Sequence, residues 1–178
     1  ERTGTTLCEL YGMTETSPPI ALVPIGKTKI GSLGIPVNNT KVAVIKPDGD
    51  EPLPFNEAGE LVVRGPQVMK GYWNNPEETK NSFVELNGEQ YFRTSDLVKM
   101  DEEGYIYFYD RKRDLIKYKG YSIYAREIEE VLKSHPKIRE AGVVGVPDPR
   151  VGENIKAVVV LEKEERGRIS EQEVIEYC

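Results

Sequence analysis

The stretch DRKRDLIKYKG, residues 110–120, separates two parts of the chain that differ in pattern. Before it, short alternating apolar runs are broken by glycine and proline, which is typical of a small barrel or curled sheet. After it, the runs have the spacing of strands and helices in a mixed domain. We therefore predict an α+β fold, with a short-stranded, barrel-like β-rich part at 1–110, a boundary segment at 111–114 and a small mixed α+β part at 115–178.

Local signals place the elements of the first part. Lys41–Lys46 alternates at period two and stops at a Pro-Asp-Gly turn, and Glu60–Arg64 and Tyr105–Asp110 are further strand candidates. Asn75-Pro76, followed by two glutamates, predicts the start of a short helix, because Asn caps, Pro fits the first turn and acids suit its positive end.

The second part is predicted to alternate strands and helices. Leu115–Tyr118 and Tyr121–Tyr124 flank Lys119-Gly120 as a hairpin, and Glu127–Ser134 has apolar residues at helical spacing. Two strands and a capped helix follow, at Ala141–Val146, Ile155–Leu161 and from Ser170 onward.

Composition narrows the class of protein. A net charge of −6 disfavours a nucleic-acid surface, and no apolar run approaches the roughly 18 residues that a membrane helix needs. Cys8 and Cys178 form neither a disulfide framework nor a metal spacing, so we expect a cytoplasmic protein. The chain starts without Met and ends within an apparent helix, so we expect it to be a piece of a longer protein.

The first candidate site is YGMTETSP, residues 11–18, after a strand expected at Thr5–Leu10. Glycine beside an aromatic lets a flat ligand approach the backbone. Hydroxyls and a carboxylate suit phosphate oxygens and Mg²⁺, which is commonly held by one or two carboxylates together with substrate phosphates. The alternative is a polar loop in which a threonine caps a helix.

Two further segments carry polar groups with two interpretations each. Asp96, at the end of YFRTSD (residues 91–96), either caps a turn or accepts hydrogen bonds from ribose hydroxyls. The five basic residues of 111–119 either cover a solvated strand face or bind an anionic, phosphate-bearing ligand at the junction of two domains.

Taken together, YGMTETSP, GELVVRGPQVMKGYW, YFRTSD and DRKRDLIKYKGYSIYAREIE resemble, in order and spacing, the adenylate-forming superfamily. That superfamily includes acyl-CoA synthetases, peptide-synthetase adenylation domains and firefly luciferase. The resemblance runs from about Thr5 to the end of the chain. It implies the carboxy-terminal piece of an AMP-forming acyl-CoA synthetase, in which the β-rich part ends the large adenylating domain and the second part is the small mobile domain, incomplete at its end.

The resemblance also implies a role for each matching residue in the first part. Tyr11 packs on adenine and Gly12 leaves room for it, while Thr14 contacts phosphate and Glu15 binds Mg²⁺. These two are the residues expected to act in catalysis. Asp96 and Arg111 are expected to hold the ribose of ATP.

In the second part, the resemblance implies that Arg113 is the hinge and that Lys117 and Gly120 line the path of the coenzyme A pantetheine. The implied substrates are ATP, coenzyme A and a carboxylic acid. By the same resemblance, we expect this acid to be a medium- or long-chain fatty acid. Ser95 stands where many relatives have Gly.

The family's glycine-rich phosphate loop would lie upstream of residue 1, and its adenylating lysine beyond Cys178, so the chain alone is predicted to be inactive. An adenylation domain that loads a carrier protein, a luciferase-like oxygenase and a non-catalytic nucleotide-binding module stay open as alternatives. A homodimer of the full-length protein is also left open.

Overall fold

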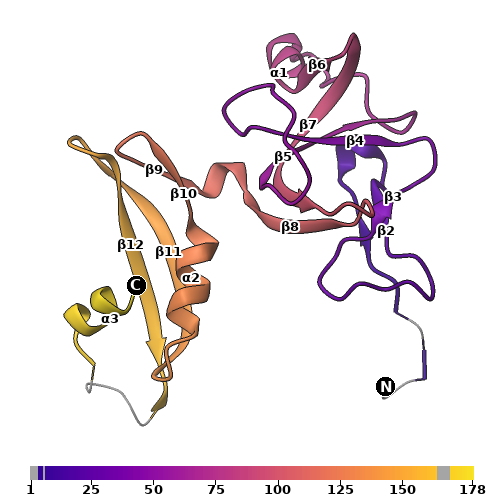
Figure 1. Cartoon of the computed structure of the whole chain (residues 1–178). Coiled ribbons are helices and arrows are strands. Elements are labelled where there is room, and N and C mark those ends of the chain that lie inside the picture. Colours follow the sequence, from indigo (N-terminus) through magenta and orange to yellow (C-terminus); the bar gives the residue numbers. More distant parts are fainter. Residues whose placement is uncertain (1–3, 6, 164–168) are drawn as a thin grey trace. The chain divides into compact units, whose positions relative to one another are not determined.

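The computed structural model describes residues 4–5, 7–163 and 169–178 and divides the chain into two compact units, Glu1–Lys112 and Arg113–Cys178 (Figure 1). The division falls inside the basic segment in which the sequence changes pattern. A single turn of 3-10 helix, Lys112–Asp114, spans it. The chain is an α+β protein, as predicted.

The first unit contains a three-stranded and a five-stranded antiparallel sheet. The small sheet has the order β1-β2-β3, with β1 at Leu10–Tyr11, β2 at Ala21–Leu22 and β3 at Ile35–Pro36. The larger sheet has the order β4-β5-β7-β6, and β8 also pairs with β7. Its strands are β4 Lys41–Ile45, β5 Gly59–Arg64, β6 Phe83–Leu86, β7 Glu89–Met100 and β8 Ile106–Arg111. The Leu33 N–H donates to the carbonyl of Ile106, which joins the two sheets.

β5 lies at the centre of this unit and is buried along Gly59–Val63. Leu61 packs with Val98 and Ile106 on one side, and Val62 packs in a second cluster with Val84. Burial of both faces explains the apolar run Leu61–Val63 of β5, and it makes the buried, charged Glu60 beside this run unusual.

Several predicted elements are confirmed. The helix α1 covers Pro76–Asn81, and the Asn75 side chain accepts a hydrogen bond from the Glu78 N–H at 3.2 Å. The predicted strand at Thr5–Leu10 is wrong for its described residues, because β1 comprises only Leu10–Tyr11; Thr6 lies outside the described residues. β2, the strand that pairs with β1, also contributes only two residues, so the described pairing begins at Leu10 opposite Leu22.

The long strand β7 pairs with three neighbours, β5, β6 and β8, and it carries Asp96. The turn that was one interpretation of Asp96 is therefore absent at this position. The strand is irregular near Ser95, whose φ of 60° lies in the left-handed region, and its register to β5 and to β8 shifts nearby. This backbone explains why glycine suits the position, since only glycine adopts such a φ without steric cost.

We expect Ser95→Gly to raise the free energy of unfolding of the chain by up to about 1 kcal/mol, because the left-handed backbone no longer opposes a side chain. Urea unfolding followed by circular dichroism measures the change. Gly88→Ala, at a turn glycine with φ of 76°, is the opposite control and is expected to destabilise the chain. A loss of stability with Ser95→Gly would mean that the serine side chain contributes more than its backbone costs.

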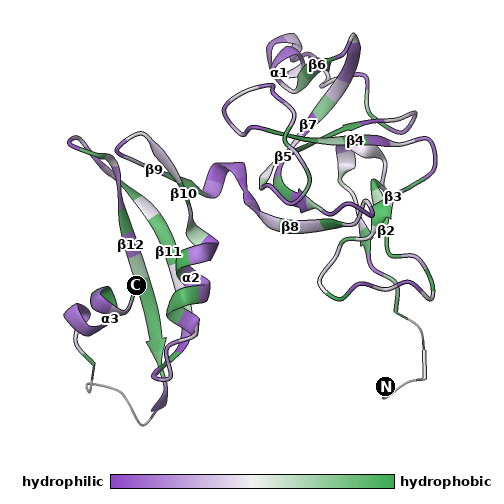
Figure 2. Cartoon of the chain, viewed as in Figure 1, coloured by the Kyte–Doolittle hydropathy of each residue, from purple (hydrophilic) through white to green (hydrophobic). Residues whose placement is uncertain are grey.

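The second unit is a four-stranded antiparallel sheet in the order β10-β9-β12-β11, with two helices. The elements are β9 Leu115–Tyr118, β10 Tyr121–Tyr124, α2 Ala125–Lys133, β11 Ile138–Asp148, β12 Gly152–Leu161 and α3 Glu171–Tyr177. Ile116, Leu132, Ile138 and Val143 form its buried centre. The apolar residues colour much of β11 and β12 green, whereas the segment between β8 and β9 is strongly hydrophilic (Figure 2).

The predicted hairpin and both predicted helices of this unit are confirmed. Tyr118 pairs with Tyr121 across the turn, and both turn residues have positive φ, 49° for Lys119 and 83° for Gly120. Two consecutive left-handed residues define the tight turn that best matches the strand twist, so the geometry of the hairpin turn itself explains a glycine at position 120. No described helix has the length and apolar character that a membrane crossing requires.

Candidate functional site

The segment YGMTETSP runs from β1 into a 3-10 turn at Thr14–Thr16. The buried Thr16 closes this turn: its hydroxyl donates to the Met13 carbonyl at 3.0 Å and accepts from the Met13 N–H at 3.2 Å. Thr14 is exposed. The capping role that the sequence suggested for a threonine therefore belongs to Thr16, and the Thr14 side chain is presented to solvent.

Tyr11, Asp96 and Arg111 come together in the first unit. The Tyr11 hydroxyl donates to Asp96 Oδ2 at 2.7 Å, and Arg111 Nε lies 3.9 Å from Asp96 Oδ1. Asp96 and Arg111 are opposite each other in the β7–β8 pair. A carboxylate has about four acceptor positions, so Asp96 has room for hydroxyl donors of a ligand in addition to Tyr11.

Burial raises the pKa of the Tyr11 hydroxyl far above its usual range, and the hydrogen bond to the Asp96 carboxylate raises it further. Tyr11 is therefore a neutral phenol whose proton is directed at Asp96. It fixes one carboxylate oxygen, while Arg111 supplies positive charge beside the other.

This raised pKa predicts a specific alkaline behaviour. Above a pH of about 10, tyrosine in the unfolded chain loses its proton while folded Tyr11 keeps it, so the unfolded state binds fewer protons and the free energy of unfolding falls as pH rises. We expect Tyr11→Phe to make that decline shallower by up to about 1.4 kcal/mol per pH unit. Urea unfolding between pH 8.5 and 11 measures it, with Tyr121→Phe at an exposed tyrosine as control. Equal slopes for the chain and Tyr11→Phe would contradict the burial of this hydroxyl.

Glu15 is positioned by the segment that precedes α1. Its backbone carbonyl accepts from the Met69 N–H at 2.7 Å, and its Oε1 accepts from the Tyr72 hydroxyl at 3.0 Å. Burial and this carboxylate both raise the pKa of Tyr72. Tyr72 was not singled out from the sequence, although it lies within the quoted motif GELVVRGPQVMKGYW.

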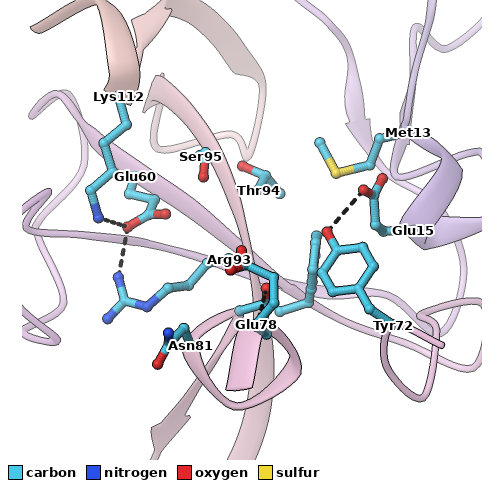
Figure 3. Close-up of a pocket in the computed structure, with 12 residues that line it drawn as sticks. Met13, Glu15, Glu60, Tyr72, Glu78, Asn81, Arg93, Thr94, Ser95 and Lys112 are labelled. Carbon is cyan, nitrogen blue, oxygen red and sulfur yellow. Dashed lines mark hydrogen bonds and ion pairs between the residues drawn. The ribbon is translucent and has the colours of Figure 1, made fainter. Parts of the chain in front are cut away.

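Glu15 and Tyr72 line an open pocket of about 360 Å³ (Figure 3). Its other lining residues come from the cap of the Thr14–Thr16 turn, from β5, from α1 and its C-cap, from β7 and from the start of the 3-10 helix Lys112–Asp114. They are Met13, Glu60, Glu78, Asn81, Ser82, Phe92, Arg93, Thr94, Ser95 and Lys112. The described residues contain no group of three or more His, Cys, Asp or Glu side chains arranged to hold a metal. A single oriented carboxylate fits Mg²⁺ when substrate phosphates complete the shell, which is the usual mode for this ion.

A buried charge cluster lies on the other side of this pocket. Glu60 Oε2 accepts from Arg93 Nη1 at 2.6 Å and from Lys112 Nζ at 2.9 Å, and Arg93 also pairs with Asp50. No local sequence pattern identified this cluster, because Glu60 is separated from these two partners by 33 and 52 residues.

The remaining predicted residues have the following places. Gly12 is required by the chain itself, since a Cβ there would lie 2.7 Å from the Cβ of Pro18. Arg113 begins the second unit and is exposed, 3.6 Å from Asp114 Oδ1. Lys117 Nζ donates to Ser122 Oγ at 2.7 Å on the β9–β10 hairpin, and Gly120 forms its turn.

Comparison with known proteins gives the family. The profile of the AMP-binding enzymes matches residues 1–73, and that of the AMP-binding enzyme C-terminal domain matches residues 127–178. A long-chain-fatty-acid–CoA ligase of Bacillus subtilis is 47% identical over 90% of the chain, and a luciferin 4-monooxygenase of Nipponoluciola cruciata is 46% identical over 94%. The crystal structure of ATP-bound MatB from Rhodopseudomonas palustris matches 98% of the chain with a TM-score of 0.83 and 36% identity.

The chain belongs to the AMP-binding enzyme family. It spans 28% of the length of the B. subtilis ligase, 30% of the luciferin monooxygenase and 34% of the MatB chain.

Proposed function

We propose that this chain is the carboxy-terminal part of an ATP-dependent acid–CoA ligase that forms AMP and pyrophosphate. The observation that carries the proposal is the meeting of Tyr11 and Arg111 on the Asp96 carboxylate. Three separate motifs supply these residues, and together they offer a ring face, a carboxylate for ribose hydroxyls and a guanidinium. That set suits an adenosine ligand, since carboxylates bind ribose hydroxyls in other nucleotide sites.

In the first half-reaction, the substrate carboxylate attacks the α-phosphorus of ATP and pyrophosphate leaves. The protein contributes mainly position and charge. Tyr11 and Asp96 hold the nucleoside, and the exposed Thr14 hydroxyl donates to a phosphate oxygen. Glu15, oriented by Tyr72, would hold Mg²⁺, which when bound neutralises charge on the phosphates.

In the second half-reaction, the thiol of coenzyme A attacks the acyl-adenylate and AMP leaves. We assign Arg113 as the hinge residue for the second unit, and Lys117 and Gly120 as residues along the pantetheine path. The exposed Arg113 at the boundary of the units supports the first assignment. The domains, in this proposal, are 1–110 and 115–178 with the hinge at 111–114, and the enzyme is cytoplasmic.

We propose a fatty acid as the acyl substrate. Two relatives named as long-chain-fatty-acid–CoA ligases, from B. subtilis and Haemophilus influenzae, are 47% and 45% identical over 90% of the chain. An apolar chain would require an apolar pocket. The polar pocket next to Glu15 is therefore assigned to the phosphate end of the reaction rather than to the acyl group.

The test uses the full-length protein, meaning the polypeptide that includes this chain. Pyrophosphate release is measured with ATP, Mg²⁺ and saturated acids of 4 to 18 carbons, with and without coenzyme A. The proposal expects acid-dependent pyrophosphate release, and acyl-CoA only when coenzyme A is added. Release without any acid, or an acyl product formed only on a carrier protein, would overturn it. The 178-residue chain alone is expected to release no pyrophosphate.

A further inference from the structure

Glu60 is a buried carboxylate at the centre of the first unit that neither half-reaction uses. Its side chain is 1% exposed, and both of its cationic partners, Arg93 and Lys112, bind the same oxygen, Oε2 (Figure 3). Arg93 also pairs with Asp50, so two carboxylates alternate with two cations in one chain of ion pairs. The other oxygen, Oε1, is buried and has no hydrogen-bond partner among the described residues.

A carboxylate in such a place is costly unless its charge is compensated, and two cations on one oxygen provide that compensation. The apolar neighbours of Glu60 in β5 show that this position could have carried a hydrophobic residue. Replacement of a buried ion pair by packed apolar side chains is often neutral or stabilising. Stability alone therefore does not explain a glutamate here.

The position of Lys112 gives the explanation. Lys112 directly follows Arg111, the last residue of β8, and begins the 3-10 helix Lys112–Asp114, so the two neighbouring side chains have different carboxylate partners. Arg111 is directed to Asp96, and Lys112 is directed to Glu60. Glu60 itself lies opposite Leu97 in the β5–β7 pair, next to Asp96 in sequence. Glu60 is thus connected to both members of the Asp96–Arg111 pair.

We propose that Glu60 is a positioning residue for the nucleotide site: by holding Lys112, it fixes the end of β8 so that the Arg111 guanidinium stays beside the Asp96 carboxylate. This inference rests on the proposed function, because it assumes that Asp96 and Arg111 bind the ribose of ATP. Arg93 also compensates the negative charge of Glu60, so Glu60 keeps one cationic partner when Lys112 is replaced.

The main test variant is Lys112→Met in the full-length protein, because Glu60 keeps Arg93 and the fold is retained. Lys29→Met is the matched control. Lys29 has nearly the same exposure, 31% against 33%, and pairs with Asp101 at the other end of the β7–β8 hairpin. Lys112→Arg is the conservative variant, since it keeps the charge and can reach the same carboxylate. Glu60→Gln, which keeps the shape and removes the charge, is the second variant.

We expect Lys112→Met to raise KM for ATP about three- to tenfold with kcat changed less than about twofold, the pattern of lost uniform binding. The preference for ATP over 2′-deoxy-ATP and 3′-deoxy-ATP, measured as the ratio of kcat/KM values, should shrink by a similar factor, because the ribose contact is what the link positions. Lys112→Arg should restore both values, and Lys29→Met should change neither.

An unchanged KM and unchanged deoxy-ATP preference in Lys112→Met would overturn the inference, and so would an equal change in Lys29→Met. Glu60→Gln provides an independent result, since it should shift the deoxy-ATP preference in the same direction even if it also lowers the midpoint of thermal unfolding. Failure of the proposed function gives different results. The unmodified protein would then show no acid-dependent pyrophosphate release, or Asp96→Ala would leave the KM for ATP unchanged.

Discussion

Replacing Asp96 with Ala in the full-length protein is expected to lower kcat/KM for ATP by about 30- to 1000-fold, since hydrogen bonds to a charged group are worth about 1.5–3 kcal/mol each and the carboxylate would hold both ribose hydroxyls. The change removes the acceptor that faces the Tyr11 hydroxyl and leaves the Arg111 guanidinium without its carboxylate. Steady-state pyrophosphate release at varied ATP measures it. Most of the effect should appear in KM for ATP, because the ribose is bound in both the ground state and the transition state.

Asp101→Ala is the matched control for this prediction. Asp101 also accepts from a lysine and a tyrosine, and its side chain is 19% exposed against 16% for Asp96. It lies at the turn beyond β7, away from the Tyr11–Asp96–Arg111 cluster. It should lower stability without altering KM for ATP. If both variants raise KM equally, the loss reflects general destabilisation and the ribose assignment of Asp96 is wrong.

Glu15→Gln is expected to lower the rate of the first half-reaction by about 100-fold or more, the magnitude typical of removing one electrostatic stabiliser from an acyl- or phosphoryl-transfer site. Glutamine keeps the shape and the hydrogen bond from Tyr72 but has no negative charge for Mg²⁺. Acid-dependent exchange of labelled pyrophosphate into ATP, measured over a range of Mg²⁺ concentrations, isolates this step. The half-saturating Mg²⁺ concentration should rise.

Glu78→Gln is the control, because Glu78 lines the same pocket, whereas Glu15 is the carboxylate that accepts the hydrogen bond of the Tyr72 hydroxyl. Tyr72→Phe should have a smaller effect than Glu15→Gln, since it frees the carboxylate without removing its charge. A Glu15→Gln enzyme with unchanged Mg²⁺ dependence would remove Glu15 from the metal site.

The elements that were predicted well from the sequence are those with strong local signals. Asn75-Pro76 fixes the start of α1 through a cap and a favoured first turn, and Lys119-Gly120 fixes the β9–β10 hairpin through two left-handed residues. The expected strand at Thr5–Leu10 failed, because strand formation depends on a distant partner that the local pattern does not contain.

The candidate site shows the same limit, namely that local sequence patterns do not contain distant partners. Tyr11 and Asp96 are 85 residues apart, so only the resemblance of ordered motifs, and not spacing, suggested that they meet. Neither the local sequence pattern nor the family resemblance predicted the ion pair between Glu60 and Lys112. A glutamate at the start of an apolar strand looks like an ordinary strand end. Its burial is set by the packing of β5 between neighbours on both faces.

The central claim is that Tyr11, Asp96 and Arg111 surround one adenosine. A crystal structure of the full-length protein with a non-hydrolysable acyl-adenylate analogue tests it most directly. The account predicts both ribose hydroxyls within about 2.6–3.2 Å of the Asp96 carboxylate, and the Tyr11 ring against the adenine. An analogue bound with its ribose away from Asp96, with the Tyr11–Asp96 hydrogen bond unchanged, would contradict the account.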